Sequence, residues 1–473
     1  MSNKNNIGRF IHSVFIILSL VISTAYAELK LPSGADRRPN LSVDPFERAR
    51  EALRKLPSSE PEPTPEPTQP ASESTAPAQT EREEHNLPPT IVSDSPTGGA
   101  TSGEAFSYEI GVTVDALSVT AGGIVEPAED DFEQSKTGIF GLVNLVGEFD
   151  TGAAGFWEDG LFFGSAAMIY GKGPAVGDLH GTSGIYAGGN TFRIVELWYD
   201  HSFPYSNSSA LFGLHDFNSE FYVSEFASLF VNAGFGMGQV IAENGGPSGY
   251  PTPTLGTRLK VDLSEKIYFQ AAVYDAAPTD EAFDKVIEIK LPKNEELFFA
   301  TEFGMINKEP GEAGYFKAGM GIWYLRADTS GFEDANGASI LTEPRAGNGG
   351  VYVLGEMSIG EKLGIFFKHG RGKSEFNQFG QFYAAGLNYT GIIPGRETDV
   401  LGFGLVHTRQ TDAFLAAFPE TFFVAETTYE ITYTTEIADW VTVQPDLQFI
   451  QQPSMDPNLG NTLVIGVRAM ATF

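Results

Sequence analysis

The sequence predicts an all-β fold, an antiparallel transmembrane β-barrel of about 16 strands of the kind found in the bacterial outer membrane. Three observations predict it. Apolar and polar residues alternate in short segments from residue 106 to residue 473, the connections between these segments alternate between short and long, and the chain begins with an export signal. Outer-membrane barrels combine an even number of strands with short turns at one end and longer loops at the other.

The N-terminal residues 1–27 are predicted to be a cleavable signal peptide. Basic residues precede an apolar run over 10–22, and a small-residue site follows at 25–27. This order is typical of secretory signals. An uncleaved membrane anchor is the alternative, but a membrane-spanning helix needs about 20 apolar residues, more than this run supplies. The mature chain is therefore expected to leave the cytoplasm.

The next part of the chain differs in composition from everything after it. Residues 28–56 are predicted to hold a short amphipathic helix, because Asp44 followed by Pro45 favours a helix start. Residues 57–105 form a Pro-rich acidic linker that lacks the apolar residues for a core and is expected to be disordered. The helix could contact the cell wall or a periplasmic partner; a tolerated disordered tail is the alternative.

The outer-membrane β-barrel domain is predicted over residues 106–473. Most of its segments have the length of a tilted strand that crosses a bilayer, about 9 to 11 residues. Period-two alternation predicts strands at 107–118, 138–150, 160–170, 191–202, 208–215, 254–262, 266–276, 297–306, 314–324, 350–358, 363–370, 382–390, 400–408, 427–437, 440–450 and 463–473.

The connections assign a side of the membrane to each end of the barrel. Those at 263–265, 360–362 and 438–439 are short, whereas the connection at 216–253 is the longest. Outer-membrane barrels have short periplasmic turns and long external loops. Both termini are therefore expected in the periplasm.

The polar side of the strands is expected to line a lumen, and the apolar side to face lipid. Along 430–450, Ile431 and Leu447 alternate with Glu430 and Gln448. A soluble sandwich is the alternative, but such folds usually have about seven to nine strands. The chain also ends on a strand at Phe473, which resembles the signal read by the outer-membrane insertion machinery.

Segments spread over most of 190–473 resemble the carbohydrate-selective porins of the OprB type. They are "FRIVELWYDHSF" (192–203), "HDFNSEFYVSEFASLFVN" (215–232), "LGTRLKVDLSEKIYFQAAVYDAAP" (255–278), "GLNYTGIIPGRETDVLGFGL" (386–405) and "YEITYTTEIADWVTVQPDLQFIQQP" (429–453). The resemblance implies a sixteen-stranded outer-membrane barrel through which sugars and other small polar solutes diffuse inward. The sequence departs from the family in its Pro-rich opening, where a Gly- and Trp-containing stretch is usual, and in Ala471, where an aromatic residue is common.

The predicted pore constriction combines lumen-facing wall residues with the start of the longest loop. Val195, Leu197 and Tyr199 are expected to point outward, which leaves their neighbours inside. Mixed charges with aromatic rings between them suit a sugar, because hydroxyls both donate and accept hydrogen bonds. For any single residue, an ordinary solvated wall position is the alternative. The candidate substrate-binding residues are Glu196, Trp198, Asp200, His215, Asp216, Asn218, Glu220, Arg258, Lys260, Lys317 and Trp323.

The long connection at 216–253 is the predicted constriction loop. Its Phe221, Phe226 and Phe230 are expected to pack it against the barrel wall. The segment "YGKGPAVG" at 170–177 lacks the Lys-Ser/Thr ending of a phosphate loop. A flexible external loop is expected there instead.

Composition argues against several other functions. A net charge of −31 disfavours a nucleic-acid partner. No cysteine is present for disulfides or thiolate metal sites. No catalytic residue, metal site or cofactor is predicted, because the histidines have neither metal-ligand spacing nor a neighbouring nucleophile. The acidic run at 126–133 could hold cations that bridge lipopolysaccharide, although a solvated loop is the default.

The leading hypothesis is a porin, not an enzyme, for passive diffusion of carbohydrates and other small polar solutes into the periplasm. The alternative is an outer-membrane structural protein that tethers the envelope through its N-terminal periplasmic arm, with a general diffusion pore. A barrel hydrolase would need an acid–base pair at the external rim, and the sequence offers none. Besides carbohydrates, the expected partners are outer-membrane lipid, lipopolysaccharide and, during assembly, the insertion machinery.

Overall fold

The computed structural model describes residues 105–124, 136–185, 189–245, 248–276, 286–287, 296–329, 345–375, 377–419 and 421–473. The predicted signal peptide, the amphipathic segment and nearly all of the Pro-rich linker lie outside these residues, as does the acidic run at 126–133. None of the helices in the described part of the chain has both the length and the apolar character to cross a membrane.

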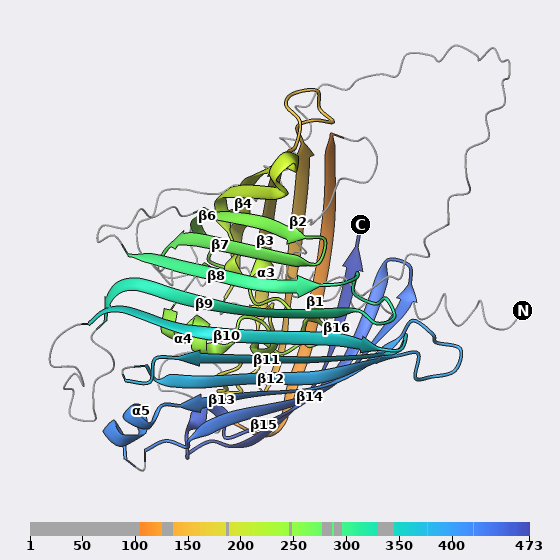
Figure 1. Cartoon of the computed structure of the whole chain (residues 1–473). Coiled ribbons are helices and arrows are strands. Elements are labelled where there is room, and N and C mark those ends of the chain that lie inside the picture. The colour runs from red at the N-terminus through yellow and green to blue at the C-terminus, as the bar shows by residue number, and fades with distance from the viewer. Residues whose placement is uncertain are drawn as a thin grey trace, which may run out of the picture. The chain divides into compact units, whose positions relative to one another are not determined.

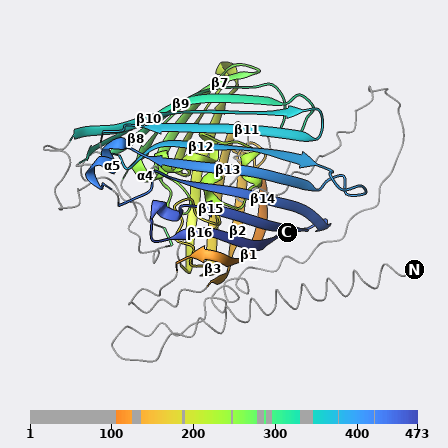
Figure 2. The same ribbon diagram turned by 90° about the horizontal axis from the view of Figure 1, so that it is seen from below.

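Sixteen antiparallel strands close into a single barrel (Figures 1 and 2). Each strand overlaps the segment predicted for it, so the predicted fold class is confirmed. The strands are β1 (Phe106–Gly123), β2 (Thr137–Asp150), β3 (Gly160–Lys172), β4 (Thr191–Phe203), β5 (Ser208–His215), β6 (Thr254–Ser264), β7 (Ile267–Asp275), β8 (Leu297–Ile306), β9 (Phe316–Thr329), β10 (Arg345–Ile359), β11 (Leu363–Gly372), β12 (Phe379–Thr390), β13 (Val400–Gln410), β14 (Ala425–Ala438), β15 (Val441–Gln451) and β16 (Gly460–Thr472).

Short helices lie in the connections between the strands. The connection between β5 and β6 carries α3 (Phe217–Glu220), η2 (Ala227–Leu229), η3 (Ala233–Phe235) and α4 (Gln239–Gly245). The others are η1 (Pro204–Ser206), α5 (Asp412–Ala417) and η4 (Pro453–Met455).

The barrel closes where the first strand pairs with the last. Asp115 of β1 lies opposite Arg468 of β16, and the Nε and Nη2 atoms of Arg468 donate to the two carboxylate oxygens of Asp115 at 2.8 Å each. A buried bidentate pair of this kind is a strong, geometrically specific contact. The start of β1, the end of β16 and the tight turn between β14 and β15 all lie at the same end of the barrel.

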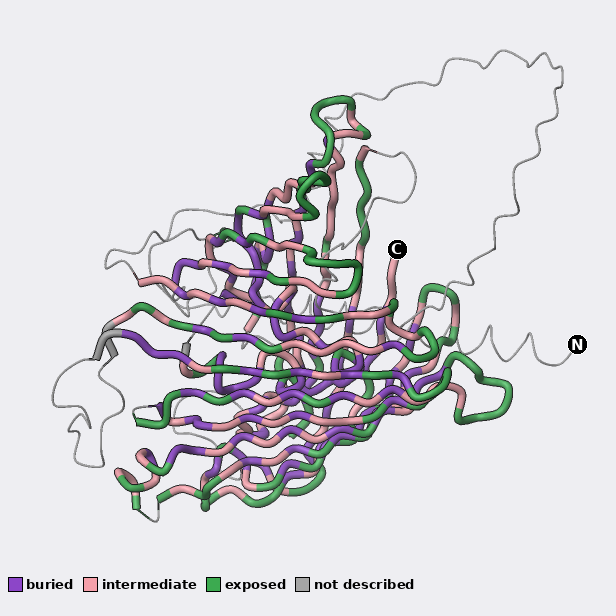
Figure 3. Tube along the Cα trace, viewed as in Figure 1, coloured by how far each residue is buried: buried purple, intermediate pink, exposed green. Residues whose placement is uncertain are grey.

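The two faces of the wall differ as the alternation predicts. Glu430 and Gln448 are fully buried inside the barrel, whereas Ile431 and Leu447 are 46% and 37% exposed on its outside. Figure 3 shows this as alternation of buried and exposed positions along the strands. An apolar outer face and a polar inner face are the arrangement that a bilayer requires of a barrel.

Val195 is an exception, and the prediction that it points outward is wrong. Its neighbours Glu196 and Ile194 pair with consecutive residues of β3, so Val195 is the extra residue of a β-bulge. A bulge shifts the side-chain alternation by one position. Val195 is therefore buried among apolar residues inside the barrel, while Leu197 remains exposed outside.

Candidate functional site

The connection between β5 and β6, here called the constriction loop (residues 216–253), runs along the inner face of the wall. Buried glutamates on the strands accept hydrogen bonds from its backbone. Glu302 of β8 accepts from the Tyr222 N–H at 2.8 Å. Glu356 of β10 accepts from the Phe226 N–H at 3.1 Å and from the Ser224 hydroxyl at 2.6 Å. Bonds of this kind to a carboxylate are stronger than neutral ones.

Strands β14 and β15 hold the next stretch of the same loop. Glu430 accepts from the N–H groups of Val231 and Asn232 at 2.6 and 3.0 Å. Gln444 of β15 donates to the Leu229 carbonyl at 2.7 Å. The loop therefore crosses the inside of the barrel from β5 to β15.

Aromatic side chains of the loop pack onto glycines of the wall. The rings of Phe230 and Phe235 stack with centroids 4.3 Å apart, and a Cβ atom added at Gly404 would lie 2.6 Å from Phe235. Phe226 lies over Gly364 in the same way, at 2.9 Å. Glycine at these wall positions lets the rings approach the backbone, so the predicted packing of the loop against the wall is confirmed.

Arg258 of β6 joins the loop to the wall at its first turn. Its Nε and Nη2 atoms donate to the Glu220 carboxylate at 2.6 Å each, and Nη1 lies 3.3 Å from Oδ1 of Asp200. Burial alone would raise the pKa of Glu220, but the Arg258 guanidinium outweighs it and the pKa falls below its ordinary value. Glu220 is therefore ionised at neutral pH.

Trp198 lies behind this turn. Its ring stacks on Phe163 with centroids 4.7 Å apart, and its Nε1 donates to Glu196 at 3.3 Å. Glu196 in turn accepts from the Asp216 N–H at 3.1 Å, where the loop begins. Both side chains on β4 are buried, so this pair supports the loop from behind.

Asp216 and His215 fix the start of the loop. The Asp216 carboxylate accepts from the N–H groups of Asn218 and Tyr250 at 2.7 and 2.9 Å, which ties the two ends of the loop together. Burial raises the pKa of Asp216 to about 6 despite these two bonds. The Nδ1 atom of His215 lies 2.7 Å from the Tyr274 hydroxyl.

The remaining predicted residues lie farther along the wall. Lys317 of β9 reaches the loop at Glu225, with 3.6 Å between Nζ and Oε1. The Nζ of Lys260 lies 5.6 Å from the centre of the Tyr268 ring. Trp323 is buried and stacks on Phe298 at 6.1 Å, and Phe298 in turn contacts Phe217 at the start of the loop.

Burial divides the predicted site into two groups. Glu196, Trp198, His215, Asp216, Arg258 and Trp323 are buried. The partly exposed group is Asp200, Asn218, Glu220, Lys260 and Lys317. The wall glutamates Glu356 and Glu430 were not among the predicted site residues, although an acidic residue in mid-strand on the lumen side signals that hydrogen-bond donors must meet it.

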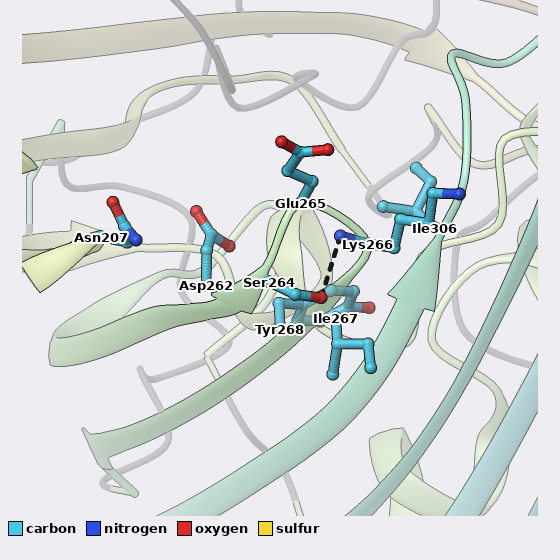
Figure 4. Close-up of a pocket in the computed structure, with 8 residues that line it drawn as sticks. All are labelled: Asn207, Asp262, Ser264, Glu265, Lys266, Ile267, Tyr268 and Ile306. Atoms are coloured by element: carbon cyan, nitrogen blue, oxygen red, sulfur yellow. Dashed lines mark hydrogen bonds between the residues drawn. The ribbon is translucent and has the colours of Figure 1, made fainter.

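A hollow of about 800 Å³ opens at the tight-turn end of β6 and β7. Figure 4 shows Asn207, Asp262, Ser264 and Tyr268 around it, with the Lys266 N–H donating to the Ser264 hydroxyl. Tyr268 links this hollow to Lys260, since the two side chains are in contact. Polar groups therefore continue from the loop toward this mouth of the barrel.

Within the ranges that the structure describes, no group of three or more His, Asp or Glu side chains could hold a metal ion.

Three comparisons bear on the identity of the chain. Residues 146–473 match the family model described as carbohydrate-selective porin, OprB family. Porin B of Pseudomonas aeruginosa is 22% identical over 338 residues, which cover 63% of this chain and 72% of that protein. The high-pH structure of Pseudomonas putida OprB has a TM-score of 0.66 at 17% identity, and the match covers 78% of this chain and 94% of that one. The fold is shared with that structure.

Proposed function

Because the chain belongs to the OprB family of carbohydrate-selective porins, we propose that carbohydrates and other small polar solutes diffuse passively through it into the periplasm. Family and fold place the protein in the outer membrane of a Gram-negative bacterium and point to a channel rather than an enzyme. The observation that carries the proposal is the constriction loop, which glutamates and aromatic contacts hold inside the barrel. A loop fixed in this way narrows the path that a solute must take.

The partly exposed group is proposed to contact the solute. Asp200 supplies acceptors, Lys260 and Lys317 supply donors, and the Asn218 amide supplies both, whereas both carboxylate oxygens of Glu220 already accept from Arg258. These residues lie on the first part of the loop and on the strands next to it. The buried group, including Trp198, is proposed to act by holding the loop in its place.

The orientation and the remaining partners are also proposals. The tight-turn end, where both ends of the barrel domain lie, is proposed to face the periplasm, as is usual for outer-membrane barrels. The outward apolar residues would contact lipid and lipopolysaccharide, and Phe473 would be read by the insertion machinery. The tether hypothesis depends on residues 28–104, which lie outside the described residues, and the comparisons do not support it.

The proposal is tested by ion current through the refolded protein in a planar bilayer, titrated in turn with glucose, maltose and phosphate. Saturable block by a sugar, with little block by phosphate, is the expected result. Current that no sugar reduces would reject carbohydrate selection and leave a general diffusion pore. Absence of any current would reject the channel itself.

A further inference from the structure

The connection between β3 and β4 enters the barrel; of the segment 170–177, for which an external loop was expected, residues 170–172 belong to β3. Its described part beyond β3, residues 173–185, is here called the second loop. Val176, His180, Ser183 and Ile185 are all buried. The hydroxyl of Ser183 donates to Asp115 of β1 at 2.6 Å, on the lumen side of the wall. The second loop therefore occupies space inside the lumen.

The second loop pairs with the constriction loop through the backbone. The Gly184 N–H donates to the Val231 carbonyl, and the Ala233 N–H donates to the Gly181 carbonyl, each at 2.9 Å. These bonds flank the two N–H groups that Glu430 holds. The same stretch of the constriction loop is thus held by the wall on one side and by the second loop on the other.

Side chains of the wall also bridge the two loops. Gln448 of β15 donates to the Thr182 carbonyl at 2.9 Å and accepts from the Asn232 amide at 3.0 Å. On β13, the Thr408 hydroxyl lies 2.9 Å from Nε2 of His180 and donates to Gln239 of α4 at 3.2 Å. The wall side chains Gln448 and Thr408 therefore each connect the two loops, in addition to the direct backbone hydrogen bonds between them.

Glu426 of β14 anchors the second loop to the wall. Its carboxylate accepts from the N–H groups of Leu179 and His180 at 2.8 and 3.0 Å, and from the Ser454 N–H at 2.5 Å. The side chain is fully buried. None of these donors belongs to the constriction loop, and two of the three belong to the second loop.

We propose that the second loop is a positioning element for the pore constriction, with Glu426 as its anchor. Glu426 fixes residues 179–180, and residues 181–184 then hold residues 231–233 of the constriction loop in place. This inference rests on the proposed function, since it names what holds the constriction loop in a fixed position inside the lumen.

The test is Glu426→Gln in the full chain. Glutamine offers one acceptor oxygen where the carboxylate offers two, and its amide group would face N–H donors. Sugar block of the bilayer current is expected to weaken about five- to tenfold. Amide hydrogen exchange over residues 229–235 is expected to accelerate about tenfold, although Glu426 does not contact them.

Glu148→Gln is the matched control, because Glu148 is a half-buried glutamate of β2 that accepts from the Ser107 hydroxyl at 3.5 Å. It is expected to leave both readouts unchanged. A folded Glu426→Gln barrel with unchanged exchange over 229–235 would overturn the inference, whatever the sugar result.

A second measurement on the unaltered protein covers the case in which Glu426→Gln does not refold. Exchange in rising denaturant should show residues 179–185 and 229–235 losing protection together, as one cooperative unit. Separate loss of protection would overturn the inference. If the unaltered protein shows no sugar block, the proposed function fails, while both exchange readouts still decide whether the second loop positions the constriction loop.

Discussion

Two sets of charged residues bond to or within the constriction loop, and they differ in how far their side chains are exposed. Glu302, Glu356 and Glu430 are at most 2% exposed and accept hydrogen bonds from its backbone. Glu225 of the same loop and Lys317 of β9, which form an ion pair, keep 22% and 12% of their side-chain surface exposed. A buried carboxylate without donors would be costly, so the first set holds the loop, whereas the second keeps part of its surface open to solvent.

The largest effect is expected from Trp198→Ala, which tests whether burial marks a supporting role. Loss of a buried tryptophan typically costs about 3 to 5 kcal/mol of unfolding free energy, and this one also steadies Glu196 behind the start of the loop. Urea unfolding of the refolded barrel measures the cost, and weakened sugar block is expected alongside it.

Trp157→Ala is the control for that substitution. Trp157 is 47% exposed in the connection between β2 and β3, and its removal is expected to cost less than about 1 kcal/mol. Equal costs for the two substitutions would mean that burial does not separate supporting residues from the rest.

Glu356→Gln is expected to have the next largest effect. The carboxylate accepts from the Tyr315 hydroxyl as well as from Ser224 and Phe226, and one amide oxygen cannot replace both of its oxygens. At about 1.5 to 3 kcal/mol for a hydrogen bond to a charged group, sugar block should weaken about tenfold or more. The measurement is sugar titration of bilayer current.

The exposed Glu361, in the turn after β10, provides the comparison for that substitution. Glu361→Gln removes the same charge from the surface and should leave sugar block unchanged. A similar loss of block in both variants would attribute the effect to net charge instead of to the loop.

The strands were predictable because their signal is local. Alternation along a single segment fixes which residues face lipid, as at Ile431 and Glu430, without knowledge of the neighbours. The prediction for Val195 failed because a bulge depends on how β4 pairs with β3, and the sequence of one strand does not reveal that register. The error is confined to this one position of β4.

The candidate site was predictable only in part. The alternation along a strand tells on which face of the wall a side chain lies, but not how deeply that side chain is buried. The alternation placed Trp198 and Asp200 correctly on the lumen side. The path of the folded loop decides that Trp198 is buried while Asp200 keeps part of its side chain exposed. The second loop was missed because its inward path is set by Glu426, a residue some 250 positions away in the chain. Contacts of that separation leave no periodic trace in the sequence.

Lys317→Gln, on the exposed edge, is expected to produce a smaller change. Partly exposed ion pairs contribute about 0 to 1 kcal/mol, so barrel stability should stay nearly constant. Sugar block should weaken about two- to threefold, and reversal potentials in a salt gradient should shift toward cation selectivity as a positive charge leaves the lumen. The exposed Lys308, between β8 and β9, is the control: Lys308→Gln should change neither. A large loss of stability in Lys317→Gln would move Lys317 into the supporting set.

The smallest expected effect is the pH dependence that Asp216 contributes. Burial raises its pKa from 3.8 to about 6, so between about pH 4 and 6 the folded protein keeps a proton that the unfolded chain has released. The unfolding free energy should therefore fall as pH rises through this window and level off above it, by about 1 to 3 kcal/mol for this residue.

Asp216→Asn isolates that contribution, because Asp178 has a pKa raised to about 6 by burial as well and persists in the variant. The measurement is urea unfolding of both proteins from pH 4 to pH 7, and the informative quantity is their difference at each pH. Burial explains why the unfolding free energy falls as pH rises. The two N–H donors to Asp216 offset its desolvation only in part, so ionisation of the buried carboxyl still costs free energy. A difference that does not change with pH would mean that the pKa of Asp216 is the same in the folded and the unfolded protein, so that its hydrogen bonds offset its desolvation in full.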